Sequence, residues 1–113
     1  MKFFFNKKHR LTTTRDFNYV LNFPNVVKCR EIVILGRVNS LSFARLGISI
    51  SRKNIRYSYQ RNKMKRLIRE KFRIIQYRLL HLDFVVIVKA CSVQMEFKSL
   101  VQELENLWSH YYQ

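Results

Sequence analysis

The segment YSYQRNKMKRLIREKFRIIQYRLL, residues 57–80, decides the fold of this 113-residue chain. Its apolar residues recur at steps of three and four, the spacing of one face of an amphipathic helix. They are Met64, Leu67, Ile68, Phe72, Ile75 and Leu79. The opposite side of the helix would carry Asn62, Lys65, Arg66, Arg69 and Arg73. The segment therefore predicts a helix with one side against a core and the other side cationic.

Three segments around this helix have the composition of strands. Residues 84–88 are apolar without alternation, which is typical of a strand buried on both faces, so we expect it in the middle of a sheet. Residues 32–38 are mostly β-branched and apolar, and residues 46–50 alternate apolar with small or polar side chains. We expect these two upstream strands to pair with each other.

Two shorter helices are expected near the ends of the chain. Thr13 and Asp16 have the spacing of a capping box, which predicts a helix ending near Pro24, and residues 97–111 repeat apolar residues at helical steps. The order of elements predicts an α/β (α+β) two-layer sandwich with a small central sheet. We expect one domain over residues 1–113, with a mobile basic leader over residues 1–10.

The charge of the chain points to a polyanionic partner. There are 22 Lys and Arg residues against 7 Asp and Glu, a net charge of +15, and between Arg52 and Arg78 the only acid is Glu70. A basic helix face kept only for solubility normally mixes both signs, and a membrane-lying helix would need the apolar side that must cover the sheet here. Nucleic acid is therefore favoured over a solvated face or a membrane. No apolar run is long enough to span a bilayer, so we expect a cytoplasmic protein.

The run RNKMKRLIRE, residues 61–70, resembles the signature of the bacterial ribonuclease P protein component, R-N-R-x-K-R-x-x-R-E. Lys63 replaces the usual Arg, which keeps the charge but loses bidentate phosphate geometry. The flanking segments 45–56 and 83–89 are also similar to this family, especially to its enterobacterial-type branch, and the resemblance extends to Arg10-Leu11, Asp16-Phe17 and Leu107-Trp108.

This resemblance implies a protein subunit that binds a catalytic RNA, which removes the 5′ leader of precursor tRNA. No catalytic or metal-binding residue is expected in the chain, magnesium is held mainly by the RNA, and no membrane or obligate protein partner is implied. The residues expected to bind RNA are Arg52, Lys53, Arg61, Asn62, Lys63, Lys65, Arg66, Arg69 and Arg73. Alternatives from the residues alone are another RNA-binding protein, such as a ribosomal protein, a nonspecific DNA binder, or a protein nuclease.

The family resemblance also implies a cleft for the single-stranded leader, in which aromatic side chains stack on bases. Phe17 matches one such position, and Tyr19, on another helix face, is a weaker candidate. Leu21 and Leu35 stand where relatives often have aromatic residues, so leader stacking is expected to be reduced. Finally, the resemblance implies a left-handed crossover around the signature helix, although parallel strand connections are right-handed in about 98% of cases; here we follow the family.

Overall fold

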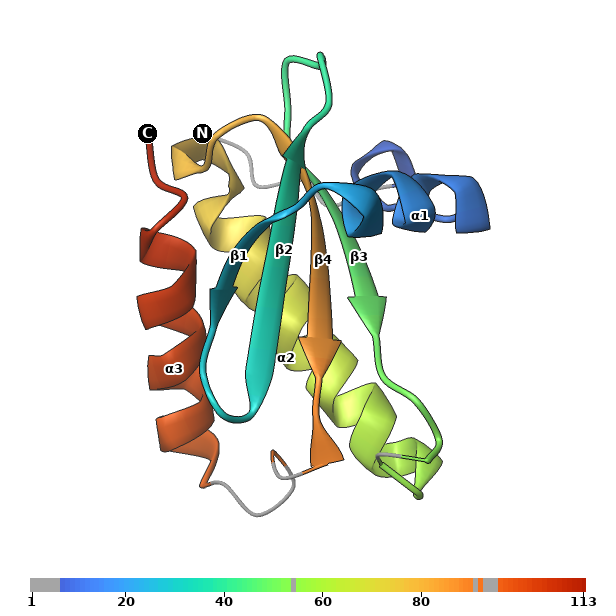
Figure 1. Cartoon of the computed structure of the whole chain (residues 1–113). Coiled ribbons are helices and arrows are strands. Elements are labelled where there is room, and N and C mark those ends of the chain that lie inside the picture. The colour runs from blue at the N-terminus through green and yellow to red at the C-terminus, as the bar shows by residue number, and fades with distance from the viewer. Residues whose placement is uncertain (1–6, 54, 91, 93–95) are drawn as a thin grey trace.

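The computed structural model describes residues 7–53, 55–90, 92 and 96–113. In chain order they form a 3-10 turn η1 (Lys7–His9), helix α1 (Thr14–Asn22), strands β1 (Asn25–Lys28), β2 (Ile32–Val38) and β3 (Arg45–Ser49), helix α2 (Ser58–Ile75), a 3-10 turn η2 (Gln76–Arg78), strand β4 (Leu82–Val88) and helix α3 (Phe97–Ser109). The strands form a mixed sheet in the order β1-β2-β4-β3 (Figure 1).

Strand β4 separates the two strands that we expected to be neighbours. It pairs antiparallel with β2, where Val85 lies opposite Leu35, and parallel with β3, where Phe84 lies opposite Leu46. The predicted pairing of residues 32–38 with residues 46–50 is therefore wrong, because the strand that is buried on both faces takes the central position between them. The short edge strand β1 was not predicted, since four residues carry too little periodicity to identify a strand.

The connection from β3 through α2 to β4 is left-handed. In Figure 1 both strands run downward, β3 lies to the right of β4, and α2 passes behind the sheet. The handedness implied by the family resemblance is confirmed, against the general preference for right-handed crossovers. As a result α2 lies on the same face of the sheet as α3.

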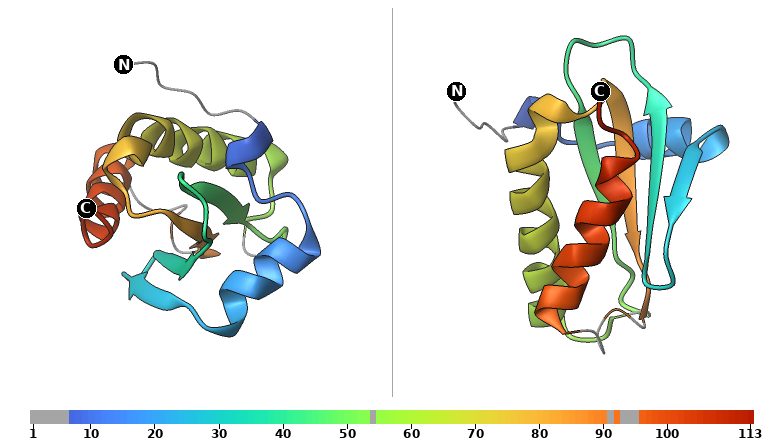
Figure 2. Two further views of the ribbon diagram at one scale, coloured as in Figure 1. Left: turned by 90° about the horizontal axis from the view of Figure 1, so that it is seen from above. Right: turned by 90° about the vertical axis from the view of Figure 1, so that its left-hand side faces the viewer.

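The α+β class predicted from the sequence is confirmed. The sheet and the α2–α3 pair make the main two layers, and α1 covers part of the opposite face (Figure 2). The larger core contains the rings of Phe72, Phe84 and Trp108, with 5.1 Å between the centroids of Phe84 and Trp108. Burying each such side chain contributes about 1.5–3 kcal/mol.

Tyr111 connects the end of α3 to the sheet. Its hydroxyl donates to the backbone carbonyls of Asn25, at 2.7 Å, and Ile34, at 3.2 Å. Burial raises the pKa of Tyr111 to about 12. Earlier in the chain, η2 and a bridge between Leu79 and Tyr112 follow α2, so the helix predicted over residues 57–80 is regular only to Ile75.

The N-terminal helix begins as the capping pattern predicts, because the Asp16 backbone N–H donates to Thr13 Oγ1 at 3.1 Å. Residues 7–10 belong to the segment that we expect to be a basic leader. His9 is buried, with its ring 5.3 Å from that of Phe43, and Arg10 forms a bridge with Leu46. Residues 7–10 therefore pack against the protein, and residues 1–6 lie outside the described residues.

Candidate nucleic-acid interface

Helix α2 presents two chemically different sides. Met64, Ile68 and Phe72 are buried against the sheet. On the outward side, a surface depression is lined by Arg10, Asn62, Lys65, Arg66, Arg69, Glu70 and Arg73. The cationic arc predicted from the helical period is therefore formed in three dimensions, and we call these residues, without Glu70, the cationic surface. Arg10, which was counted with the leader, joins it because the chain runs beside β3 at Leu46.

Arg69 is partly buried close to a second positive charge, that of Arg10. Burial and the nearby charge of Arg10 both lower the pKa of its guanidinium, and burial has the larger effect. In the described part of the chain Arg69 forms no ion pair. A phosphate brought to this point would stabilise both guanidinium groups, which is the electrostatic condition for an anion site.

Arg73 differs from the other members of the cationic surface. Its guanidinium pairs with the Glu70 carboxylate three residues earlier, through Nη2 to Oε1 and through Nε to Oε2 at 3.3 Å. This contact raises the pKa of Arg73 and lowers that of Glu70. Part of the charge of Arg73 is therefore already neutralised within the helix.

Arg61, the first residue of the signature, turns toward the protein. Its Nη1 donates to the backbone carbonyls of Ile55 and Arg56, both at 2.8 Å. Ile55 is itself only 1% exposed. Arg61 thus attaches the segment before α2 to the first turn of the helix, a structural role that helical periodicity cannot show.

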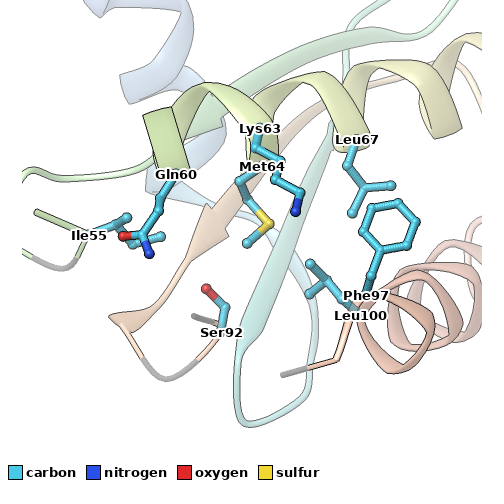
Figure 3. Close-up of a pocket in the computed structure, with 8 residues that line it drawn as sticks. All are labelled: Ile55, Gln60, Lys63, Met64, Leu67, Ser92, Phe97 and Leu100. Atoms are coloured by element: carbon cyan, nitrogen blue, oxygen red, sulfur yellow. The ribbon is translucent and has the colours of Figure 1, made fainter. Parts of the chain in front are cut away.

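Lys63, the residue that departs from the signature, faces α3 rather than the cationic surface. Its ammonium lies 5.9 Å from the centroid of the Phe97 ring. Figure 3 shows it with Met64 and Leu67 around a pocket between α2 and α3. The RNA contact that the family resemblance implies for Lys63 would therefore lie outside the cationic surface.

Arg52 and Lys53 lie in the exposed turn that follows β3. Neither lines the depression over α2, so both lie outside the cationic surface. That Arg52 and Lys53 bind RNA remains a prediction from their charge and from the family resemblance.

Phe17 lies in a second cleft, between α1 and β3. The Phe17 cleft is lined by Arg10, Leu11, Thr12, Phe17, Leu46, Gly47, Ile48, Lys65 and Arg69. The ring packs directly over Gly47, where a Cβ atom would lie 2.6 Å from Phe17 Cζ. Glycine is therefore required at this position for the ring to approach the strand so closely.

Tyr19 is not brought to this cleft. Its hydroxyl donates to the Val38 carbonyl, and the Arg37 guanidinium lies 3.9 Å from its ring centroid, at the far end of β2. Of the two other positions, Leu21 is 46% exposed on α1, whereas Leu35 is buried beneath that helix. Of the two aromatic candidates on α1, Phe17 is therefore the one that lies in a cleft with Arg10, Lys65 and Arg69.

Metal ligands are not assembled in the described ranges. No group of three or more His, Cys, Asp or Glu side chains there is placed to hold a metal ion. The carboxylate of Asp83 is instead bound by Arg45 and Asn39. These residues offer no ready ligand set for Mg²⁺. Nor do the described helices include one long and apolar enough to cross a bilayer.

Known proteins that are similar to this chain share one description. The ribonuclease P family model matches residues 5–112. The ribonuclease P protein component of Buchnera aphidicola subsp. Baizongia pistaciae is 66% identical over all of this chain and 99% of its own length, and that of Escherichia coli strain HS is 39% identical over 96% of this chain and 91% of its own.

Solved structures show the same fold. A structure of the Staphylococcus aureus RNase P protein superposes with a TM-score of 0.83 at 29% identity, covering 89% of this chain and 93% of that one. The RNase P protein of Thermotoga maritima superposes with a TM-score of 0.78 at 29% identity, covering 92% and 98%. The chain belongs to the ribonuclease P protein component family.

Proposed function

We propose that the cationic surface of α2 docks on the catalytic RNA of ribonuclease P, and that the adjacent Phe17 cleft receives the single-stranded 5′ leader of precursor tRNA. As a member of this family, the chain is the protein subunit of the ribonucleoprotein that removes 5′ leaders in tRNA maturation. We assign the catalytic centre, with the magnesium ions that the hydrolysis requires, to the RNA.

One observation carries this proposal: the two sites are continuous. Arg10, Lys65 and Arg69 line both the depression over α2 and the Phe17 cleft. A ribozyme on α2 and a leader in the cleft would therefore share the same positive charges. Such sharing lowers the repulsion between two polyanions that must meet at one cleavage site.

The division of labour follows from what each site offers. Guanidinium and ammonium groups bind phosphates without reading bases, so the cationic surface would fix the position of the RNA. The Phe17 ring offers a stacking face, which is worth about 1–3 kcal/mol for each stacked base and tolerates any sequence. The protein would therefore raise the affinity for leader-bearing substrates over mature tRNA.

Reconstitution tests the main proposal. Adding the protein to a ribonuclease P RNA should lower the magnesium concentration needed for precursor-tRNA cleavage, because protein cations replace part of the ionic screening. The rate is measured against magnesium concentration with RNA alone, protein alone and both. Cleavage by protein alone, or an unchanged magnesium dependence with both, would contradict the assignment.

Arg66→Ala tests the docking surface, with Lys63→Ala as the matched loss of charge on the same helix. Arg66 is exposed on the cationic surface, whereas Lys63 lies against Phe97. Arg66→Ala should flatten the slope of log affinity for the ribozyme against log salt by about 0.7–0.9, and Lys63→Ala should change it less. An equal change of the salt slope in both variants would mean that RNA binding does not depend on which side of α2 carries the charge.

Phe17→Leu tests the leader cleft while keeping an apolar side chain in the smaller core. Affinity for precursor tRNA should fall by about 1 kcal/mol or more, and affinity for mature tRNA should change little. The measurement is equilibrium binding of both RNAs to the reconstituted enzyme. The same loss on both RNAs would remove Phe17 from leader binding and leave it as a packing residue.

A further inference from the structure

A stack of exposed aromatic and cationic side chains lies at the start of α2, outside both sites described above. The Tyr57 and Tyr59 rings are stacked with 5.8 Å between centroids and 25° between planes. The Arg56 guanidinium lies 5.6 Å from the Tyr57 ring centroid. We propose that this Arg56-Tyr57-Tyr59 platform stacks on an unpaired nucleobase of the RNA partner.

The two tyrosine rings are exposed and do not pack into either hydrophobic core. Tyr57 is 52% exposed and Tyr59 is 68% exposed, and neither belongs to a hydrophobic core. Within the described ranges neither hydroxyl makes a hydrogen bond, so the rings are not fixed there by a polar contact of the side chain. Two stacked tyrosines left open to water mark a binding surface.

The backbone beneath the platform is held firmly. The Tyr57 carbonyl accepts from the N–H groups of Gln60, at 3.1 Å, and Arg61, at 3.2 Å, while the Arg61 side chain donates to the carbonyl of Arg56. Buried Ile55 anchors the same segment from inside. A ligand would meet a backbone that is already held in place, so binding would have to order only the side chains.

Charge decides which partner the platform fits. No acidic residue occurs in the sequence between Glu31 and Glu70, so the platform is set in a wholly basic part of the chain. Tyr59 precedes Asn62 by three residues and Arg66 by seven, which places it on the outward side of α2 in line with the cationic surface. RNA offers both the phosphate charge and the flat base that this combination binds, whereas a protein partner would have to supply acidic groups.

The inference deepens the proposed function, because it takes the RNA partner from it and adds a contact to unpaired bases. The test measures binding of the protein to two eight-residue chains in the absence of the ribozyme. One is an oligoadenylate, and the other is an abasic ribose-phosphate chain of the same length and charge. Tyr59→Leu should bind the oligoadenylate about five- to 150-fold more weakly than the unchanged protein and the abasic chain equally well. The salt slope should not change, since no phosphate contact is lost.

Two matched variants complete the test. Tyr59→Phe keeps the stacking face and should bind like the unchanged protein, and Tyr77→Leu removes a 45% exposed tyrosine beyond the other end of α2 and should have no effect. Unchanged oligoadenylate binding in Tyr59→Leu, or an equal loss on the abasic chain, would overturn the stacking proposal. The magnesium assay reports separately on the proposed function, so the two ideas fail independently.

Discussion

Two arginines, one on strand β3 and one on helix α2, have opposite electrostatic surroundings. Arg45, at the start of β3, donates to Asp83 from Nε at 2.8 Å and from Nη2 at 2.6 Å, and this carboxylate raises its pKa. Arg69, on α2, is partly buried beside Arg10, and its pKa is lowered. Arg45 is neutralised by Asp83, a residue of the neighbouring strand β4, so we assign Arg45 a structural role. Arg69 has no counter-ion in the described chain, and for this reason we propose it as a contact for an RNA phosphate.

The strongest way to test this contrast is Arg45→Met. Asp83 is 1% exposed and would keep only its 2.9 Å bond from Asn39 in place of three. Removing one partner of a buried ion pair costs about 3–5 kcal/mol, and the free energy of unfolding should fall by about the lower figure, because Arg45 is partly exposed. Denaturant unfolding measures it.

A control accompanies this measurement. The salt dependence of RNA binding by folded Arg45→Met should match that of the unchanged protein, because Arg45 is assigned to the fold. A stable variant with a flattened salt slope would instead place Arg45 in the RNA interface.

Arg69→Met should give the reverse result. The free energy of unfolding should stay within about 0.5 kcal/mol of the original value, because the lost packing is small and the repulsion from Arg10 is relieved. Affinity for the ribozyme should fall by about 1.5 kcal/mol or more, roughly tenfold, as one charged contact disappears. Unfolding and binding are measured on the same preparation. A large loss of stability with unchanged binding would make Arg69 a structural cation like Arg45.

The smallest effect is expected for Arg73→Ala. Since Glu70 already neutralises part of its charge, the salt slope should change by less than about 0.4, roughly half the value for a full phosphate contact. Glu70→Gln, which removes the carboxylate charge paired with Arg73, should steepen the slope instead. If Arg73→Ala matches Arg66→Ala, the ion pair with Glu70 must open when RNA binds.

Much of the fold could be predicted because it depends on local periodicity. The apolar stripe of α2, the central place of β4 and the cap at Thr13 each rest on residues close together in the sequence. The pairing of the strands could not be predicted in this way. A strand shows which of its side chains share a face, but it does not show which strand lies beside it.

The candidate site divides in the same manner. The helical period correctly placed Asn62, Lys65, Arg66, Arg69 and Arg73 on one side of α2. The RNA-binding role of Arg61 and Lys63 is implied by the family resemblance and not by the helical period. In the structure Arg61 donates to backbone carbonyls and Lys63 lies over Phe97. A long side chain can reach several neighbours, and only the packed structure decides which one it meets.

The sequence by itself determined that one helix is apolar on one side and cationic on the other, because both properties follow from the 3.6-residue turn. Only the tertiary structure decided that Arg10, Lys65 and Arg69 meet Phe17 around the edge of β3. These residues come from separate elements, and the left-handed crossover and the path of residues 10–13 bring them together. Such long-range placement depends on the packing of the whole core, which no short stretch of sequence contains.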